Sequence, residues 1–409
     1  MMDIVKRFIG YTAIDTTSDG NSKDCPSTPS QFELAHRLVA ELKDVGVSDA
    51  MMAENGFVYG HLGSNQPGRL ETVGFLAHLD TSDATSGKGI KARIIEEYDG
   101  KDIVLSADIV TAVADYPFLE KMKGKTLVVT DGTTLLGGDD KAGIAIIMEM
   151  LQRFSEDASL PHGPISVCFT PDEEIGVGIT HIDKHLFGAD FAYTLDGGAI
   201  DEIAYENFNA ASAHVRFNGN SIHPGSAKGK MINALQLAMD FHAMLPVFDR
   251  PEFTEKREGF NHLLALDGTC QQAEASYIIR NHDADLLEKQ KNDFIMAAQL
   301  LNKRYGHEVV SLTIADSYRN MKEGFVGKEH VIDDALSAFA NLGMAVRPEP
   351  IRGGTDGSWL TVNGVPTPNL PTGGYNFHGN HELVVVEDMK RMADVLVELN
   401  AIISRKAAD

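Results

Sequence analysis

The chain has 409 residues, enough for two or three domains at the usual ~100–200 residues per domain, each able to bury a core. Hydrophobic residues make up 43% and charged residues 23%, which is ordinary globular usage and excludes a disordered or fibrous protein. The formal net charge of −23 argues against nucleic acid or an anionic membrane as a partner, because both are bound through clustered Lys and Arg.

The N-terminal residues 3–9 alternate charges with apolar residues at helical spacing, so they lack the apolar core of a signal peptide. No apolar run approaches the ~20 residues that span a bilayer. The three cysteines, Cys25, Cys168 and Cys270, are far apart and odd in number, which excludes a disulfide framework and a cysteine-rich zinc site. We therefore expect a cytoplasmic protein.

The first two hundred residues alternate short apolar strands with helical patterns. Ile144, Ile147, Met148 and Leu151 recur at i, i+3, i+4 and i+7 and predict a helix over 141–154. We predict one buried strand before this helix, residues 73–77, and two after it, residues 165–169 and 191–195. This order predicts an α/β fold, with a mostly parallel mixed sheet covered by helices on both faces.

From about Asn207 the pattern changes to strand, helix, strand, helix, strand, which resembles a small α+β sandwich. The predicted elements are residues 214–217, 231–245 and 276–280, a helix with Phe294, Ala297, Ala298 and Leu301 on one face, and residues 308–314. A further helix near 331–342, a Gly-rich loop at 352–356 and a terminal helix then follow. We expect residues 1–206 and 320–409 to form one discontinuous domain around an inserted lid domain, residues 207–319.

Five short segments place His, Asp or Glu directly after apolar strands or in Gly-rich loops, where open α/β sheets bind their ligands. They are His78-Leu79-Asp80, Gly137-Gly138-Asp139-Asp140-Lys141, Pro171-Asp172-Glu173-Glu174, Leu195-Asp196-Gly197-Gly198 and Phe377-His378-Gly379-Asn380-His381-Glu382. Taken singly, each has an ordinary structural explanation, such as a helix cap for Asp139-Asp140 or a solvated loop for Glu173-Glu174. Their joint occurrence at several strand ends favours one site.

A set of imidazoles and carboxylates suits two divalent metals about 3.5–4 Å apart, a spacing that needs a carboxylate able to bridge both ions. Zinc accepts such mixed shells, whereas calcium and magnesium sites use oxygen ligands. In a pair of neighbouring glutamates, one can hold metal and the other can take the proton of an attacking water. The pattern therefore favours metal-assisted hydrolysis.

The motifs resemble those of the di-zinc metallopeptidase family that contains aminoacylases, carboxypeptidase G, dipeptidase V and peptidase T. The likeness to the peptidase T branch, which consists of tripeptide aminopeptidases, runs over nearly the whole chain. It is carried by residues 74–82, 170–174, 206–211 and 372–379.

The resemblance implies two zinc ions per subunit, with Co²⁺ or Mn²⁺ as alternative metals. By that resemblance His78, Asp139 and Asp196 hold one ion, and Asp139, Glu174 and His378 hold the other. Glu173 would be the general base, and Asp80 would orient the His78 ring. The family also has a cis peptide bond after the bridging Asp139, so Asp140 is not expected to be a ligand, and His381 is a weaker candidate than His378.

The resemblance further implies a homodimer, because the lid histidine of related enzymes acts across the dimer interface. His223, in Ser221-Ile222-His223-Pro224-Gly225, matches that histidine. Arg280 occupies the position at which relatives bind a substrate carboxylate, and Arg352 and Asn207 are further candidates for substrate binding. A surface arginine and a turn histidine are the structural alternatives for Arg280 and His223.

Three functions compete at this point. The first is a tripeptide aminopeptidase acting on short peptides. The second is a dipeptidase or an N-acyl-amino-acid amidohydrolase of the same fold, and the third is a non-catalytic metal- or peptide-binding module. The spare glutamate Glu173 argues against a binding module, and the absence of a Gly-x-Ser-x-Gly motif argues against a serine nucleophile. The whole-chain resemblance favours the first function.

Overall fold

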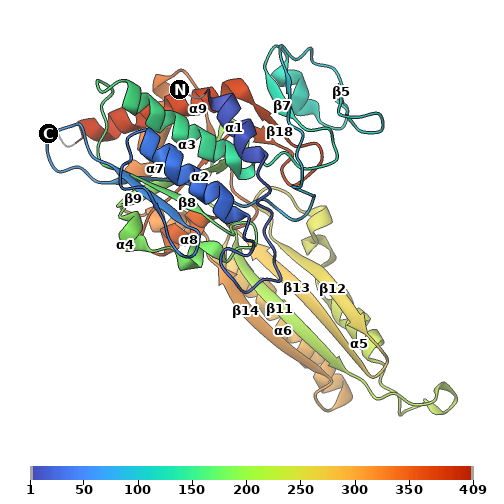
Figure 1. Ribbon diagram of the computed structural model, residues 1–409. Coiled ribbons are helices and arrows are strands. Elements are labelled where there is room, and N and C mark those ends of the chain that lie inside the picture. The colour runs from blue at the N-terminus through green and yellow to red at the C-terminus, as the bar shows by residue number, and fades with distance from the viewer. Residues whose placement is uncertain (1–2, 407–409) are drawn as a thin grey trace. The chain divides into compact units, whose positions relative to one another are not determined.

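The computed structural model describes residues 3–406, which form two compact units (Figure 1). The first contains the chain up to Tyr205, Glu323–Glu349 and the chain from Thr355 onward, and the second contains Glu206–Lys322 and Pro350–Gly354. The sequence analysis assigned all residues after 320 to the first domain. The structure places Glu206, residues 320–322 and Pro350–Gly354 in the second unit instead. In the last of these segments the Arg352 guanidinium donates to backbone carbonyls of the second unit, including that of Lys256 at 2.6 Å.

A six-stranded mixed sheet forms the centre of the first unit, in the order β1-β2-β8-β3-β9-β16. Strands β8, β3, β9 and β16 run parallel, while β1 and β2 add an antiparallel edge. The strands are β1 Met51–Met52, β2 Val58–Leu62, β3 Val73–His78, β8 Ile165–Thr170, β9 Phe191–Gly197 and β16 Asn369–Pro371. Every residue of β3 and β8 is buried, as expected for strands covered on both faces.

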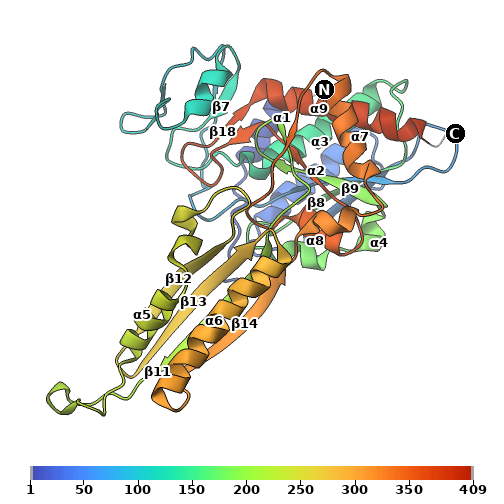
Figure 2. The same cartoon turned by 180° about the vertical axis from the view of Figure 1, so that it is seen from behind.

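Helices cover both faces of this sheet, which confirms the predicted α/β class (Figures 1 and 2). On one face α3 packs against β3 and β9, with α1 and α9 against α3. On the other face Phe187 and Leu360 join Leu76 and Cys168 in one hydrophobic cluster. The helices are α1 Ile4–Thr12, α2 Gln31–Asp44, α3 Gly138–Glu156, α4 Lys184–Phe187, α7 His330–Asn341, α8 Asp356–Val362 and α9 Val386–Arg405.

Smaller sheets surround the central one, and the sequence analysis did not predict them. The largest has the order β17-β18-β7-β4 and encloses its own hydrophobic cluster, which includes Leu127 and Leu383. Strands of two or three residues are too short to show a period, so this sheet has no sequence signal. The short strands are β4 Arg93–Ile95, β5 Ile103–Val104, β6 Val110–Thr111, β7 Leu127–Val129, β10 Glu202–Ile203, β15 Arg347–Pro348, β17 Gly374–Tyr375 and β18 Leu383–Val385.

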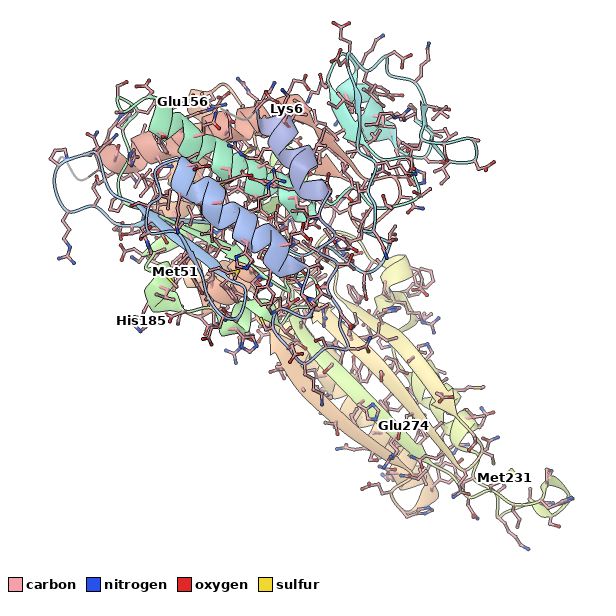
Figure 3. The ribbon with its side chains drawn as sticks, in the orientation of Figure 1. Lys6, Met51, Glu156, His185, Met231 and Glu274 are labelled. Carbon is pink, nitrogen blue, oxygen red and sulfur yellow. The ribbon has the colours of Figure 1, made fainter. Side chains whose placement is uncertain are left out.

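The second unit is a four-stranded antiparallel sheet with two helices against one face. The sheet order is β12-β13-β11-β14, and the elements are β11 Asn209–Asn218, α5 Ala234–Met244, β12 Phe260–Gly268, β13 Gln272–Asn281, α6 Ala284–Tyr305 and β14 Val310–Tyr318. Phe217, Phe241, Tyr277 and Phe294 fill the layer between sheet and helices. The opposite strand face is polar: Glu274, labelled in Figure 3, pairs with Arg216 at 2.9 Å. The α+β sandwich is therefore confirmed.

One strand of this unit, β12, was missing from the predicted order. Its register shifts between Leu263 and Ala265, so the alternation of inward and outward residues breaks in the middle of the strand. Its second half, from Leu264 to Gly268, is exposed at the sheet edge. A bulged edge strand therefore lacks the period-2 pattern by which strands are recognised.

None of the helices between residues 3 and 406 combines the length and the apolar composition that crossing a lipid bilayer requires.

Candidate active site

Four of the five expected metal ligands lie at the carboxyl ends of the parallel strands or at the start of the helix beside them. His78 is the last residue of β3, and Asp196 is the sixth of the seven residues of β9. Glu174 follows β8 in a loop, and Asp139 lies in the first turn of α3. Parallel strands end at one edge of a sheet, and this topology brings the four side chains together.

The fifth residue, His378, lies in the loop between β17 and β18, and the two histidines face opposite oxygens of Asp139. His78 Nε2 is 2.8 Å from Asp139 Oδ1, and His378 Nε2 is 3.0 Å from Asp139 Oδ2. Glu174 Oε1 lies 3.0 Å from His378 Nε2, and Asp196 Oδ1 lies 3.7 Å from His78 Nε2. This is the arrangement expected of a carboxylate that bridges two metal ions.

The donor atoms fit divalent cations. Ligand atoms of His78, Asp139 and Glu174 lie within 4.8 Å of one another, as do those of His78, Asp140 and Asp196. Glu174 Oε1 is buried, and its contact with His378 lacks hydrogen-bond geometry, so this oxygen has no hydrogen-bond partner among residues 3–406. Mixed nitrogen and oxygen donors suit zinc better than calcium or magnesium.

The electrostatics of the site also favour bound cations. Burial raises the pKa of Asp196 to about 7 and raises that of Glu173 well above its usual range. Burial acts on Asp139 too, but its bonds to two histidines outweigh this and hold its pKa below the usual range. The neighbouring carboxylates of Asp139 and Glu174 raise the pKa of His378 to about 10. Metal ions would replace the protons that neutralise this cluster.

Asp140 has a structural part in the site. One oxygen of its carboxylate accepts from the His78 backbone N–H at 3.1 Å, and the other accepts from the Gly143 N–H, also at 3.1 Å. Although Asp140 lies within reach of His78 and Asp196, both of its oxygens are therefore engaged by backbone. The Asp139–Asp140 peptide bond is cis, in agreement with what the resemblance implies.

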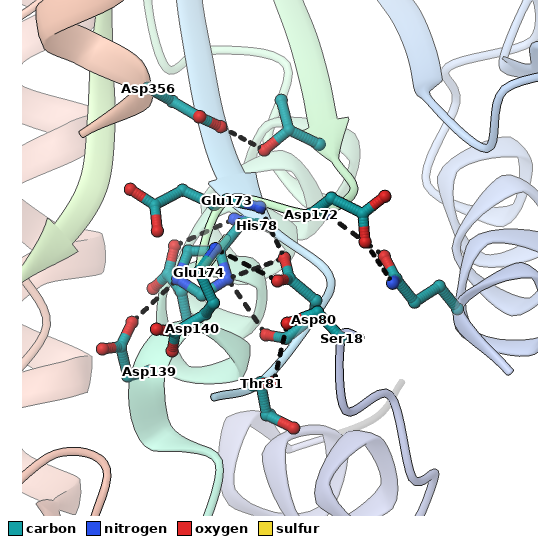
Figure 4. A network of polar contacts seen from close by, with 12 residues as sticks. Ser18, His78, Asp80, Thr81, Asp139, Asp140, Asp172, Glu173, Glu174 and Asp356 are labelled. Carbon is teal, nitrogen blue, oxygen red and sulfur yellow. Dashed lines mark hydrogen bonds and ion pairs between the residues drawn. The ribbon is translucent and has the colours of Figure 1, made fainter. Parts of the chain in front are cut away.

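Asp80 has more partners than the expected one. His78 Nδ1 lies 3.0 Å from the Asp80 backbone carbonyl and 3.4 Å from its carboxylate. The two carboxylate oxygens also accept from the backbone N–H groups of Glu173 and Glu174, at 3.0 and 3.1 Å (Figure 4). Asp80 therefore connects the first histidine to the glutamate pair.

The remaining predicted residues, His223, Arg280, Arg352 and Asn207, belong to the second unit. His223 is exposed, and its Nδ1 accepts from the Gly225 N–H at 3.1 Å, which leaves Nε2 facing solvent. Arg280 is partly exposed; its Nη1 donates to the carbonyls of Ala211 and Ile279, each at 3.1 Å. Both side chains retain donor capacity for a ligand.

The side chains of Asn207 and Arg352 are held within the second unit. Asn207 is fully buried; its amide donates to the Phe208 carbonyl at 3.0 Å and accepts from the Met321 N–H at 2.7 Å. Arg352 stacks on the rings of Phe208 and Phe260, and its guanidinium donates to the loop before β12. These contacts give both residues structural roles, and we do not include them in the proposed substrate site.

Known proteins resemble the chain over its full length. Peptidase T of Geobacillus sp. is 46% identical over 407 residues, covering 99% of each chain. Peptidase T of Alkaliphilus oremlandii is 45% identical over 409 residues, covering 99% of this chain and all of that one. The chain belongs to the peptidase T family. It is a peptidase, and the family resemblance seen in its motifs is confirmed.

Solved structures show that the fold is that of the peptidase T family. The aminopeptidase PepT of Bacillus cereus superposes with a TM-score of 0.78 at 23% identity, over 98% of each chain. A tripeptidase of Staphylococcus aureus gives 0.75 at 21% identity, also over 98% of each chain. A dinuclear metal binding peptidase of the M20 family from Bacillus subtilis gives 0.66 at 14% identity, covering 99% of this chain and 98% of that one. The family described as "Peptidase dimerisation domain" matches residues 205–306.

In this peptidase T family member, Glu382 belongs to a segment that the sequence analysis singled out, but its contacts were not predicted. The two oxygens of the buried Glu382 accept from four successive backbone N–H groups, at 2.6 to 3.2 Å; the donors are Leu136, Gly137, Gly138 and Asp139. Glu382 therefore shapes the loop that presents Asp139. Nothing in the motif predicts this, because the two segments are distant in sequence. The neighbouring His381 bonds to Thr111 at 2.9 Å and is not in either metal-ligand group.

Gly143, in α3, lies close to Asp140 and β9, and we predict that Gly143→Ala disrupts the site. A Cβ at this position would lie 2.0 Å from the Leu195 carbonyl oxygen and 2.3 Å from Asp140 Oδ1. At an unhindered helix position, alanine raises the free energy of unfolding by about 1 kcal/mol relative to glycine. Here the clash should instead lower the free energy of unfolding by about 3 kcal/mol or more and reduce the metal content. Gly63→Ala, with no atom within 4 Å of the added Cβ, is the matched control for thermal unfolding and metal analysis. Unchanged metal content in Gly143→Ala would contradict the prediction.

Proposed function

We propose that the chain is a two-zinc aminopeptidase that hydrolyses the N-terminal peptide bond of tripeptides. The observation that carries the proposal is Asp139, whose two carboxylate oxygens face His78 and His378 beside a pair of adjacent glutamates. The relatives' names, peptidase T and a tripeptidase, support the substrate class.

In this proposal His78, Asp139 and Asp196 hold one zinc ion, and Asp139, Glu174 and His378 hold the other. Co²⁺ or Mn²⁺ would suit the same donors. Zinc bound in this site would acidify a water molecule and polarise the scissile carbonyl. Glu173 accepts a proton from the attacking water and returns it to the leaving amine. Asp80 keeps the His78 ring in the required orientation through its backbone carbonyl and carboxylate.

We further propose that the second unit completes the site and forms a homodimer. The match of residues 205–306 to a peptidase dimerisation domain supports this assignment. His223, with an exposed ring, would donate a hydrogen bond to the negative charge that develops on the oxygen of the scissile carbonyl. Arg280 would bind the substrate's C-terminal carboxylate. The free cysteines Cys25, Cys168 and Cys270 suit the cytoplasm, where we place the enzyme.

The alternative function is a dipeptidase or an N-acyl-amino-acid amidohydrolase of the same fold. One assay separates the candidates: zinc-loaded enzyme is offered tripeptides, dipeptides, tetrapeptides and N-acetyl amino acids side by side. Release of the N-terminal residue from tripeptides in preference to the other substrates is expected. Preferred cleavage of dipeptides or of N-acetyl amino acids would replace the proposal with the alternative.

Arg280 gives a prediction about peptide length. If its guanidinium binds the C-terminal carboxylate, the distance from Arg280 to the zinc pair selects three residues. A charge-assisted bond contributes about 1.5–3 kcal/mol, so Arg280→Ala should lower kcat/KM for tripeptides by roughly one to two decades and flatten the length preference. Arg216→Ala, which removes an exposed arginine of the same unit, is the charge-matched control. An unchanged length preference in Arg280→Ala would refute the role.

A further inference from the structure

The carboxylate of Glu173 is not held by any side chain in the described part of the chain. Neither a hydrogen bond nor an ion pair to this carboxylate occurs among residues 3–406, in contrast to the bonded carboxylates of Asp80, Asp139 and Asp140. A general base must lie within hydrogen-bond reach of the proton that it removes. Its direction must therefore be set by the backbone from which it projects.

That backbone is fixed by side chains from two other segments. Three successive N–H groups donate outward: Asp172 N to Gln31 Oε1 at 3.3 Å, and Glu173 N and Glu174 N to the two oxygens of Asp80 at 3.0 and 3.1 Å. The acceptor of the first bond, Gln31, is on α2, and the acceptor of the other two is Asp80, which follows β3. The turn carrying the two glutamates is thus held from both sides.

Asp172 is the residue that gives this turn its shape. Its φ of +57° is in the left-handed region, which is uncommon for residues other than glycine. Its buried carboxylate accepts from the Ser27 N–H at 2.7 Å, from Ser27 Oγ at 2.5 Å and from Gln31 Nε2 at 2.7 Å. Together with the bond from Asp172 N to Gln31, these contacts form a reciprocal pair between Asp172 and Gln31.

We propose that Asp172, held by Ser27 and Gln31, is a positioning residue that aims Glu173 at the attacking water. The segment from Ser27 to Gln31 is then part of the catalytic apparatus, although it contributes no ligand and no base. The inference rests on the proposed role of Glu173. A merely structural role for the contacts would affect stability without a specific effect on the chemical step.

The test begins with Asp172→Asn in the full-length, zinc-loaded enzyme. The new amide can still accept from Ser27 N–H, but its NH₂ faces the NH₂ of Gln31. Rotating the Gln31 amide does not help, because its NH₂ would then face the Asp172 N–H. We expect kcat to fall by about 10–100-fold, since displacement of a catalytic group by about 1 Å costs this much. KM should stay within about twofold, and both zinc ions should remain bound.

The second variant is the double exchange Asp172→Asn with Gln31→Glu. The carboxylate introduced on α2 would accept both from the new side-chain amide and from the backbone N–H of the same turn residue, so two bonds again join the two residues, with the charge on the other side. We expect the kcat of this double variant to be at least about tenfold higher than that of Asp172→Asn. Rescue of kcat at constant zinc content is a result that general destabilisation would not give.

Two further variants keep the test decisive if Asp172→Asn does not fold. Ser27→Ala removes the hydroxyl bond to Asp172 together with the bond that the same hydroxyl accepts from the Asp19 N–H. Gln31→Met removes both bonds between the amide and Asp172, and the longer ones from its NH₂ to Ser27 and Thr28, at similar volume. Gln152→Met, a buried glutamine on α3 that bonds to Arg7 at 2.8 Å, is the matched control and should keep wild-type kcat. The inference is overturned if Ser27→Ala and Gln31→Met also keep wild-type kcat, or if the loss appears in KM or zinc content instead. Activity of Glu173→Gln would instead refute the proposed base.

Discussion

Replacing Glu173 by Gln is expected to reduce turnover by roughly 10²–10⁴-fold or more while both zinc ions stay bound. Zinc should stay bound because Glu173 belongs to neither of the two metal-ligand groups. Glutamine keeps the volume of the side chain and changes only the carboxylate to an amide, so the fold should be unaffected. Metal analysis and steady-state kinetics on the same purified sample provide the measurement.

Asp139→Asn is the matched comparison, because it makes the same carboxylate-to-amide change at the proposed bridge. This variant should lose zinc as well as activity, since Asp139 faces both histidines. Glu173→Ala should behave as Glu173→Gln does. Full zinc content in Asp139→Asn, or substantial activity in either Glu173 variant, would overturn the assignment of base and bridge.

Three of the six strands of the central sheet, β3, β8 and β9, and the ligands near their ends could be predicted from the sequence because they leave strong local patterns. The mostly apolar runs that became β3 and β8 are long enough to show burial; His78 ends the first strand, and Glu174 lies four residues after the second. His378 has no such pattern. It was found through the resemblance of its motif, and the structure brings its ring within 3.0 Å of Asp139.

The contacts that support the site could not be predicted, because they join segments that are distant in sequence. Glu382 reaches a loop more than two hundred residues away, and Asp172 bonds to Gln31 across 141 positions. Each of these side chains is an ordinary acid or amide in its own local sequence. Only the fold shows that the oxygens of Glu382 accept from backbone N–H groups and that those of Asp172 accept from Ser27 and Gln31.

These contacts divide the acidic residues of the site into two groups. Asp140 and Glu382 direct both of their carboxylate oxygens to backbone N–H groups, and so they stabilise loops. Asp139, Glu174 and Asp196 direct oxygens toward the histidines, and so they remain available to cations. A sequence in which all five are simply Asp or Glu cannot distinguish the groups, whereas their hydrogen-bond partners do.

The second large effect is expected for His223. This exposed histidine lies in the segment that matches a peptidase dimerisation domain, and it is separated in sequence from every proposed metal ligand. His223→Ala should lower kcat by roughly 10²–10³-fold, the usual cost of losing one donor to an oxyanion, and leave zinc bound. If His223 acts on the active site of the partner subunit, each site needs residues from two chains.

Mixing two inactive variants tests whether His223 acts across the interface. A Glu173→Ala chain and a His223→Ala chain should each be nearly inactive alone. In their heterodimer, the His223→Ala chain supplies an intact Glu173, and the Glu173→Ala chain supplies an intact His223 to that same site. After subunits have exchanged at random, half of the dimers are mixed and each has one complete site, so activity should recover to roughly a quarter of wild type. A mixture that stays as inactive as its parents, once exchange has been verified, would show that His223 does not act across the interface.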